Sequence, residues 1–319
     1  MASEFELIDR YFRRATHHTA LGVGDDGAIV RPSPGMEIVI STDMLVAGTH
    51  FLPNADPGDL GWKTLAVNVS DMAAMGAAPR WALLAAALPA ATETWVAAFA
   101  KSFFECADAF GVDVIGGDTT RGPRNFCVTI FGEVPQGQAL LRSGARPGDE
   151  IWVSGSPGLA ALGLAHLQGR CLLAEPALTA CLSALQRPQP RVALGLALRG
   201  VASAAIDVSD GLLADLGHIL EESNAAARVE VERLPGDAFA CGATADLARD
   251  CLLAGGDDYE LVFTAPAARH EEIERISADL RLALTCIGSI EGGKAGDLAL
   301  LEGGRPVEAL HRGFDHFGG

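Results

Sequence analysis

The chain has 319 residues, of which 49% are hydrophobic and 20% are charged. That length and apolar content suit roughly two globular domains of about 150 residues each and exclude a globally disordered chain. Asp and Glu (41) outnumber Lys and Arg (24), and the net charge of −17 argues against non-specific binding to nucleic acid or to anionic membranes.

Hydrophobic periodicity and turn residues predict alternating strands and helices along both halves of the chain. An amphipathic helix at the N-terminus is followed by strands at 28–30 and 37–41, a helix at 60–75, a strand at 80–88, a helix at 92–110 and strands at 112–115 and 126–133. Strands are then predicted at 150–154, 203–208, 228–232, 260–264 and 285–290, with helices at 158–168, 191–199, 212–223 and 270–281. Turn chemistry is densest between residues 134 and 149, so we expect an N-terminal domain at 1–138 and a C-terminal domain at 139–319. Each is expected to be an α/β or α+β layer with one sheet face covered by helices.

Seven cysteines are scattered along the chain without a C-x-x-C pair. An odd, scattered set is typical of reduced thiols in a cytosolic protein rather than of a secreted disulfide framework. The first 14 residues mix charged and apolar side chains and contain no apolar signal-peptide core. The Ala-rich stretch at 81–91 contains Pro89 and is too short to span a bilayer. We therefore expect a cytoplasmic protein without a membrane segment.

Six short segments combine carboxylates with Gly, Ser or Thr, and most follow an apolar run. They are Gly24-Asp25-Asp26, Ser41-Thr42-Asp43, Asn68-Val69-Ser70-Asp71, Gly116-Gly117-Asp118-Thr119-Thr120, Asp207-Val208-Ser209-Asp210-Gly211 and Gly255-Gly256-Asp257-Asp258-Tyr259-Glu260. Three of them, Thr42-Asp43, Gly116-Gly117-Asp118 and Asp207-Val208-Ser209-Asp210-Gly211, are predicted to lie at the C-terminal ends of strands. Hard oxygen ligands in Gly-rich turns suit magnesium, which commonly accompanies phosphate. Each segment alone also fits an ordinary turn or helix cap, but together they indicate a magnesium–nucleotide site.

Other residues add to this hypothesis. Asp71 lies inside an apolar helix, where a carboxylate needs a partner, and Asn68 shares its helix face. Arg142 lies in the interdomain break and is either a phosphate clamp or a surface arginine. His50, close to the Asp43 segment, is a candidate substrate contact. The chain has no P-loop, no protein-kinase catalytic loop and no G-x-S-x-G elbow, so a phosphotransferase here would belong to neither common kinase class.

Read together, the motifs resemble the bacterial thiamine-monophosphate kinase family. They are Gly22-Val23-Gly24-Asp25-Asp26, the run from Ser41 to Phe51, Asn68-Val69-Ser70-Asp71-Met72-Ala73-Ala74-Met75-Gly76, Gly116 to Gly122, Ile206 to Gly211, and the closing Gly313-Phe314-Asp315-His316-Phe317. The likeness runs from near residue 4 to this closing motif. It implies a two-domain PurM-like fold whose N-terminal domains pair in a homodimer. It also implies ATP-dependent phosphorylation of thiamine phosphate to thiamine diphosphate, by direct in-line transfer assisted by magnesium ions.

The resemblance assigns roles to residues at matching positions. The implied magnesium ligands are Asp26, Ser41, Thr42, Asp43, Asp71, Asp118, Asp207 and Asp210. Contacts to ATP are implied for Gly117, Asp118, Arg142 and Ser209, with Phe104 as an aromatic contact to adenine, and contacts to thiamine phosphate for His50, Asp257 and Phe314. The acceptor is already an ionised phosphate, so no general base is expected, and positioning and charge neutralisation carry the reaction. Asp257 stands where a Glu is expected in many relatives, which shortens its reach.

Two alternatives remain open. The chain could be another ATPase of the same superfamily that activates a carbonyl or a selenide. Selenide chemistry would predict a reactive Cys or Sec near the N-terminus, whereas the first cysteine is Cys106. It could also be a non-catalytic regulator that binds magnesium or nucleotide. Turnover of thiamine phosphate distinguishes these alternatives from the kinase.

Overall fold

The structure is a computed structural model that describes residues 4–90, 92–309 and 313–314. Over these residues the chain divides into two compact units. The first unit comprises the described residues up to Met72 and Ala77–Gly137, and the second comprises Ala73–Gly76 and the described residues from Gln138 onward. The division into domains at 1–138 and 139–319 stays a prediction.

In the described part of the first unit, four strands form one sheet in the order β3-β6-β4-β5. The elements of this unit are α1 (Glu4–Tyr11), β1 (Thr19–Leu21), β2 (Ile29–Val30), β3 (Met36–Val46), α2 (Pro57–Ala74), β4 (Ala78–Leu88), α3 (Glu93–Phe110), β5 (Asp113–Arg121) and β6 (Asn125–Pro135). Strand β6 pairs antiparallel with both β3 and β4, whereas β4 and β5 run parallel. Parallel neighbours need a crossover, and α3 supplies it.

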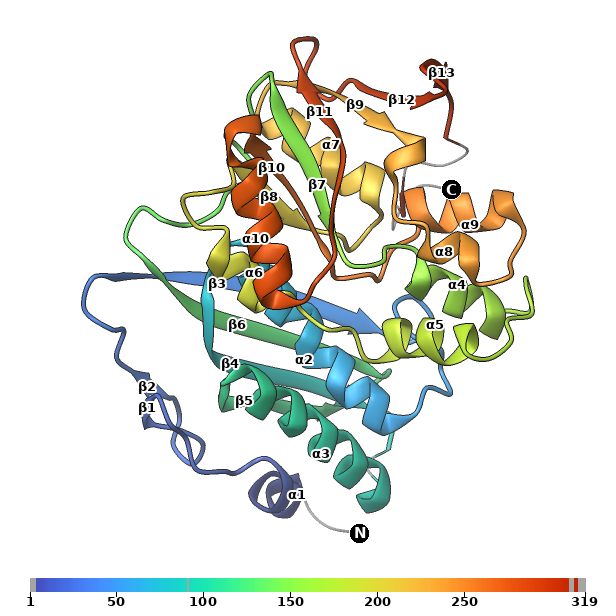
Figure 1. Cartoon of the computed structure of the whole chain (residues 1–319). Helices are drawn as coiled ribbons and strands as arrows, with labels where there is room; N and C mark the ends of the chain where they lie inside the picture. The colour runs from blue at the N-terminus through green and yellow to red at the C-terminus, as the bar shows by residue number, and fades with distance from the viewer. Residues whose placement is uncertain (1–3, 91, 310–312, 315–319) are drawn as a thin grey trace. The chain divides into compact units, whose positions relative to one another are not determined.

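Helices α2 and α3 lie on one face of this sheet (Figure 1). Phe126, Val128 and Ile130 alternate along β6 and are buried on that face. The ring of Phe99 on α3 stacks on Phe126 with centroids 4.7 Å apart. The core of the first unit therefore lies between the sheet and these helices.

Two strands of the first unit are longer than predicted. Strand β3 continues through Thr42 and Asp43 to Val46, and β5 continues through Gly117 and Asp118 to Arg121. The prediction that these segments are turns at strand ends is wrong. Pairing of β3 with β6 and of β5 with β4 along their whole lengths outweighs the turn propensity of Ser, Thr, Asp and Gly.

In the described part of the second unit, seven strands form a mixed sheet in the order β13-β12-β9-β11-β7-β10-β8. Its strands are β7 (Asp149–Ser154), β8 (Ala204–Asp207), β9 (Ala226–Glu230), β10 (Leu261–Pro266), β11 (Leu284–Glu291), β12 (Leu298–Glu302) and β13 (Arg305–Val307). Its helices are α4 (Leu159–Leu167), α5 (Ala177–Gln186), α6 (Val192–Ala197), α7 (Leu212–Glu222), α8 (Asp237–Ala240), α9 (Ala245–Ala254) and α10 (His270–Leu280), with 3-10 turns η1 (Val231–Arg233) and η2 (Ala267–Arg269).

Helices cover both faces of the second sheet, with α6 and α10 on one side and α7 on the other (Figure 1). Val153 packs in one core with Leu216 of α7. Trp152, its neighbour on β7, packs in a second core with Leu194 of α6 and Ile273 of α10. The prediction of one covered face is therefore wrong for this unit, because its central strands carry apolar residues at consecutive positions.

The segment Ala73–Gly76, which includes the last two residues of α2, belongs to the second unit. The carbonyl of Met75 accepts a hydrogen bond from the Leu140 N–H (3.0 Å), and the carbonyl of Gly76 accepts one from Arg199 Nε (2.5 Å).

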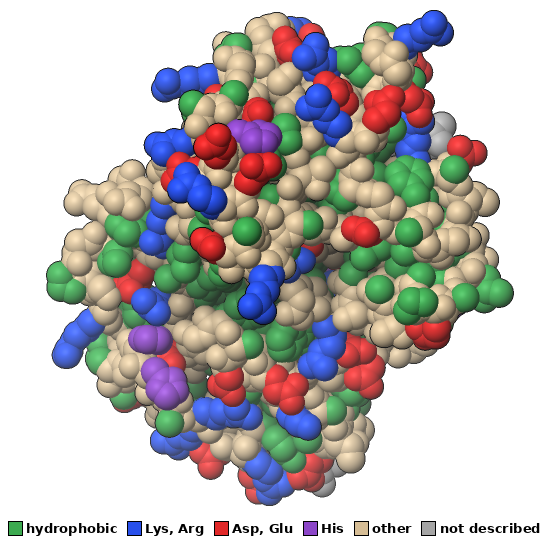
Figure 2. Space-filling view, viewed as in Figure 1, with side chains coloured by type: hydrophobic (Ala, Val, Ile, Leu, Met, Phe, Trp, Pro, Cys, Tyr) green, Lys and Arg blue, Asp and Glu red, His purple; other side chains and the backbone are tan. Residues whose placement is uncertain are grey.

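On the face of the second unit drawn in Figure 2, Lys and Arg side chains are interspersed with Asp and Glu. None of the helices within residues 4–90 and 92–309 combines the length and the hydropathy that a membrane span requires.

Candidate functional site

A cluster of polar side chains joins β3 to α2 in the first unit. The hydroxyl of Ser41 donates to Asp71 Oδ2 (2.6 Å), and the backbone N–H of Asp43 donates to Asn68 Oδ1 (3.0 Å). Strand residues two apart share a sheet face, and helix residues three apart share a helix face, so these pairs meet. Asn68 was not predicted as a site residue, and here it holds the backbone of Asp43.

The structure places the side chains of Thr42 and Asp118 away from this cluster. Thr42 alternates to the opposite sheet face, where its hydroxyl bonds to that of Thr129 (2.9 Å). Asp118 is in register with Ala85, which pairs with Cys127 and so with Met44, on that same opposite face. Strands β3 and β5 are the two edges of the sheet, three interstrand spacings or about 14 Å apart. In the first unit of a single chain, the side chains of Asp118 and Asp71 therefore do not lie together.

Two further predicted residues of the first unit lie in loops. Asp26 is exposed between β1 and β2, and its N–H donates to the Asp25 carboxylate (3.1 Å). His50 follows β3 and is half-buried, and its Nδ1 accepts a hydrogen bond from the Val46 N–H (3.0 Å). Because Nδ1 accepts, Nε2 carries the proton of the neutral ring.

Phe104 is buried on α3, with 4% of its surface exposed. The guanidinium carbon of Arg14 lies 4.0 Å from the centroid of its ring, and the ring of Phe12 packs at 6.3 Å. Arg14 and Phe12 thus pack against the ring of Phe104 inside the first unit. A contact between Phe104 and adenine stays a prediction that these neighbours do not favour.

The loop after β8 is organised by a residue that the sequence reasoning did not single out. Strand β8 ends at the buried Asp207, and the chain turns through Ser209 and Gly211 into α7. Asp215 Oδ2 accepts hydrogen bonds from the backbone N–H groups of residues 209, 210 and 211 at 3.0, 3.0 and 3.1 Å. Asp215 is 2% exposed. An acidic residue in the first turn of the predicted helix at 212–223 was the available signal.

Carboxylates are concentrated around this loop. Burial, and after it the negative charge of Asp207, raise the pKa of Asp215 to about 7, although hydrogen bonds from the loop N–H groups act in the opposite direction. Repulsion of this kind is relieved when a cation binds. The candidate metal ligands on this loop and in the Ser41–Asp71 cluster are oxygen atoms. Oxygen ligands fit magnesium rather than a metal that prefers thiolates. Among the described residues, however, no three His, Cys, Asp or Glu side chains are already arranged to hold a metal ion.

The sixth acidic segment lies directly against this loop. The N–H of Asp257 donates to the Ser209 carbonyl and that of Tyr259 to the Val208 carbonyl, both at 2.8 Å. The hydroxyl of Tyr259 donates to Asp257 Oδ1 (3.1 Å). Asp257 and Tyr259 have positive φ angles of 71° and 53°. Strained backbone of this kind concentrates at functional sites, which supports the prediction for Asp257.

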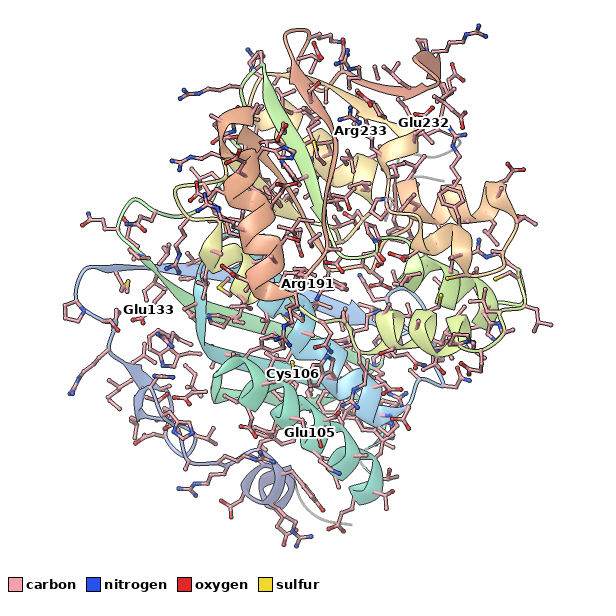
Figure 3. The ribbon with its side chains drawn as sticks, viewed as in Figure 1. Glu105, Cys106, Glu133, Arg191, Glu232 and Arg233 are labelled. Atoms are coloured by element: carbon pink, nitrogen blue, oxygen red, sulfur yellow. The ribbon has the colours of Figure 1, made fainter. Side chains whose placement is uncertain are left out.

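Two acids, the half-buried Asp258 and the buried Glu260, anchor this segment on either side of Tyr259. Asp258 accepts the Gly158 N–H (2.7 Å), and burial raises the pKa of this carboxyl well above its ordinary value. Glu260 pairs with both Arg191 Nε (2.6 Å) and Arg191 Nη2. Arg191, which is labelled in Figure 3, directly precedes α6. The ion pair and the N–H contact fix the backbone from which Asp257 projects.

Phe314 reaches the same loop from the C-terminal segment. Its N–H donates to the Asp210 carbonyl (2.9 Å), and 53% of its surface is exposed. A Cβ on Gly313 would lie 2.4 Å from the Ala214 Cβ, so only glycine allows this approach. Asp315, His316 and Phe317 of the closing motif lie outside the described residues.

Of the predicted residues, the structure thus gathers five around one loop of the second unit: Asp207, Ser209, Asp210, Asp257 and Phe314. Arg142 is exposed beside the start of β8, where the neighbouring Leu141 carbonyl accepts the Ala205 N–H (2.9 Å). The geometry is that of an oxygen-rich loop at the C-terminal end of a strand, a common ligand position in layered α/β domains.

Comparisons with known proteins identify the family of this chain. Residues 24–134 match the family "AIR synthase related protein, N-terminal domain", and residues 146–300 match "AIR synthase related protein, C-terminal domain". Thiamine-monophosphate kinase of Salmonella typhimurium is 46% identical over 321 residues, with 98% of each chain covered. The crystal structure of thiamine-monophosphate kinase from Stenotrophomonas maltophilia has a TM-score of 0.86 and 46% identity, with 96% of this chain and 98% of that chain covered.

A structure of AaThiL complexed with AMPPCP and TMP matches with a TM-score of 0.77 and 30% identity, covering 98% of this chain and 97% of that one. These matches span both units, and the identities extend over nearly the whole chain. The chain therefore belongs to the thiamine-monophosphate kinase family, within the AIR synthase related proteins.

Proposed function

We propose that this chain transfers the γ-phosphoryl group of ATP to thiamine monophosphate, forming thiamine diphosphate and ADP. The observation that carries the proposal is the near full-length identity to thiamine-monophosphate kinases. The AaThiL relative, which binds AMPPCP, an ATP analogue, together with TMP, supports the same pair of substrates.

The residues required for this reaction position groups and balance charge rather than move protons. The acceptor is a phosphate that is already ionised near neutral pH, so no strong general base is needed. Ser41, Asp43 and Asp71 of the first unit, and Asp207 and Asp210 of the second, are proposed to hold magnesium, with Asp26, Thr42 and Asp118 as further candidates. When bound, magnesium neutralises the charge of the phosphates and aligns donor with acceptor.

On the nucleotide side, Ser209 is proposed to contact the phosphates through its hydroxyl. Its backbone is already fixed, since its N–H is bound to Asp215 and its carbonyl to the Asp257 N–H. A fixed backbone loses little freedom when a ligand binds, which favours affinity. Arg142, Gly117 and Phe104 are further candidates for contacts to ATP.

On the acceptor side, Asp257 and Phe314 are proposed to bind the thiamine moiety. The thiazolium ring is cationic, so a carboxylate and an exposed aromatic face suit it by charge pairing and cation–π contact. Both residues are held by the carbonyls of the same loop, at Ser209 and Asp210. His50 is proposed as a further contact from the first unit.

We also propose a cytoplasmic homodimer formed through the first unit. The sheet face opposite α2 and α3 carries exposed apolar side chains, with Ile40 60% and Met44 52% exposed on the edge strand β3. Large apolar residues that share one face of a strand are typical of an interface. A second copy of this chain is the proposed occupant.

The test is a coupled assay with purified protein, Mg-ATP and thiamine monophosphate, in which ADP and thiamine diphosphate are quantified separately. Equal amounts of both products support the kinase. ADP without thiamine diphosphate would contradict it and favour another ATPase of the superfamily. Binding of Mg-ATP without turnover of any acceptor would favour a regulator.

A further inference from the structure

The loop 208–211, between β8 and α7, makes two sets of backbone hydrogen bonds. Its N–H groups bond to one side chain, and its carbonyls bond to two distant segments. The N–H groups of Ser209, Asp210 and Gly211 all point to one oxygen, Asp215 Oδ2, at 3.0–3.1 Å. Asp215 is buried and lies one helical turn beyond the loop. A carboxylate that accepts three N–H groups holds them more strongly than a neutral acceptor would.

The carbonyls of the same loop hold residues from two distant segments. Val208 accepts the Tyr259 N–H, Ser209 accepts the Asp257 N–H, and Asp210 accepts the Phe314 N–H, at 2.8, 2.8 and 2.9 Å. Each peptide plane is rigid, so the direction of an N–H fixes the direction of the carbonyl attached to the same plane. The three N–H bonds to Asp215 therefore also set the orientation of the carbonyls that hold Asp257 and Phe314.

We infer that Asp215 is a positioning residue that holds the nucleotide-binding and the acceptor-binding groups of the second unit in mutual register. The inference rests on the proposed function, because it assigns Ser209 and Asp210 to the Mg-ATP side and Asp257 and Phe314 to the thiamine side. Asp215 Oδ2 is occupied by the N–H groups of the loop, so the role assigned to Asp215 is to position the loop rather than to contact a ligand.

Asp149 offers a matched control in the same unit. It is also buried (5% exposed), and its Oδ2 accepts the Arg146 N–H (3.0 Å) and the Ser203 hydroxyl (2.6 Å). It pairs with Pro266 at one end of β10, whereas Asp207 pairs with Leu261 at the other end. Loss of the Asp149 charge should reduce the stability of the fold without changing the structure of the loop 208–211.

The experiment compares Asp215→Asn and Asp149→Asn in the full-length protein. The first readout is hydrogen–deuterium exchange of peptides that cover residues 208–212, 256–260 and 313–314. The second is the kcat and the separate KM values for Mg-ATP and for thiamine monophosphate. The third is the melting temperature, which reports the loss of stability that both variants share.

For Asp215→Asn, exchange should rise in all three peptides, both KM values should rise, and kcat/KM should fall about 100-fold, as expected for a misplacement of about 1 Å. Asp149→Asn should lower the melting temperature but leave both KM values within about threefold of wild type. Unchanged exchange at 256–260 and 313–314 in Asp215→Asn, or a rise in only one KM, would overturn the inference. Failure of the wild-type protein to phosphorylate thiamine monophosphate would instead reject the proposed function, and would leave the exchange result to judge the positioning role.

Discussion

The Ser41 hydroxyl donates a 2.6 Å hydrogen bond to Asp71 Oδ2, and this bond joins an edge strand to the helix that covers it. The carboxylate accepts the bond with one oxygen, and the alternation of β3 puts Asp43 on the same face as Ser41. The orientation of the Asp71 carboxylate therefore depends on the strand as well as on its own helix.

The first prediction concerns this pair. Asp71→Asn should lower kcat at least ~100-fold, because an amide replaces an anionic oxygen ligand of the proposed magnesium site. Ser41→Ala should lower kcat less, by about tenfold, since the Asp71 carboxylate remains. This variant loses only the hydroxyl that orients Asp71, which is itself a weaker ligand. Steady-state rates measured across a magnesium titration check both values.

The double variant refines this prediction. If the serine acts through Asp71, the combined loss should be smaller than the product of the two single losses. Multiplicative losses would show that the two side chains act independently. Near wild-type rates in Asp71→Asn at all magnesium concentrations would show that the Ser41–Asp71 cluster takes no part in the reaction.

The second prediction concerns Gly117, which was expected to contact ATP. Its φ is 153°, and a Cβ there would lie 1.8 Å from the Leu84 carbonyl oxygen on the neighbouring strand β4. Gly117→Ala should therefore force β4 and β5 apart and lower the free energy of unfolding by about 3 kcal/mol. Gly122→Ala is the control, because its Cβ would meet only the Ala87 Cβ at 3.5 Å. Equal stability of the two variants in urea denaturation would refute the steric explanation.

Sequence patterns predicted most of the elements and several site residues, but not their lengths or contacts. The strands at 37–41 and 112–115 were ended too early because Thr42, Asp43, Gly117 and Asp118 are favoured in turns. Their pairing with β6 and β4 is a tertiary effect that propensity does not contain. Composition and motif spacing suffice to place Asp43 and Asp71 in one hypothesis, but only the packing of β3 against α2 shows that Ser41 and Asn68 hold them.

Asp215 shows a second limit of sequence reasoning. It lies among apolar residues of an amphipathic helix, where an isolated Asp usually faces solvent. Its burial follows from the turn at Gly211, which brings three N–H groups over the first turn of α7. Spacing alone does not reveal that convergence, although the motif Asp207-Val208-Ser209-Asp210-Gly211 does predict that the loop matters.

The third prediction is a pH dependence of stability through Asp113. Burial alone would raise the pKa of Asp113, but hydrogen bonds from the N–H groups of His17 and His18 and from the Thr19 hydroxyl lower it below its ordinary value of 3.8. A lowered folded-state pKa stabilises the fold above the unfolded-state pKa, and this contribution is lost as the pH falls through the folded-state value. Acid should therefore remove it below about pH 4.

Asp113→Asn tests this dependence. At pH 7 the substitution should lower the free energy of unfolding by about 1–3 kcal/mol, because it weakens a buried carboxylate that accepts hydrogen bonds from three donors. The difference from wild type should shrink between pH 4 and pH 2. The exposed Asp279, replaced by Asn, serves as the control. A difference that stays constant over this range would contradict the linkage.

The fourth prediction concerns the proposed dimer. Ile40→Glu or Met44→Glu places a charge on the exposed apolar face of β3 and should convert the dimer to a monomer in sedimentation equilibrium, since burying an unpaired charge is costly. Leu172→Glu, at a residue that is 87% exposed in the second unit, should leave the mass unchanged. A dimer that survives both β3 substitutions would exclude this face as the interface.

The last prediction separates the ring of Phe314 from the backbone that presents it. Phe314→Ala removes only the ring, so the KM for thiamine monophosphate should rise about tenfold, as loss of a cation–π contact implies, while the KM for Mg-ATP stays near wild type. Phe314→Tyr keeps an aromatic face and should retain most of the affinity. Gly313→Ala instead pushes the segment away from Ala214 and breaks the bond from the Phe314 N–H to the Asp210 carbonyl. Because Asp210 belongs to the Mg-ATP side, this variant should raise both KM values. An equal effect of Phe314→Ala on both substrates would show that the ring supports the loop rather than the thiamine moiety.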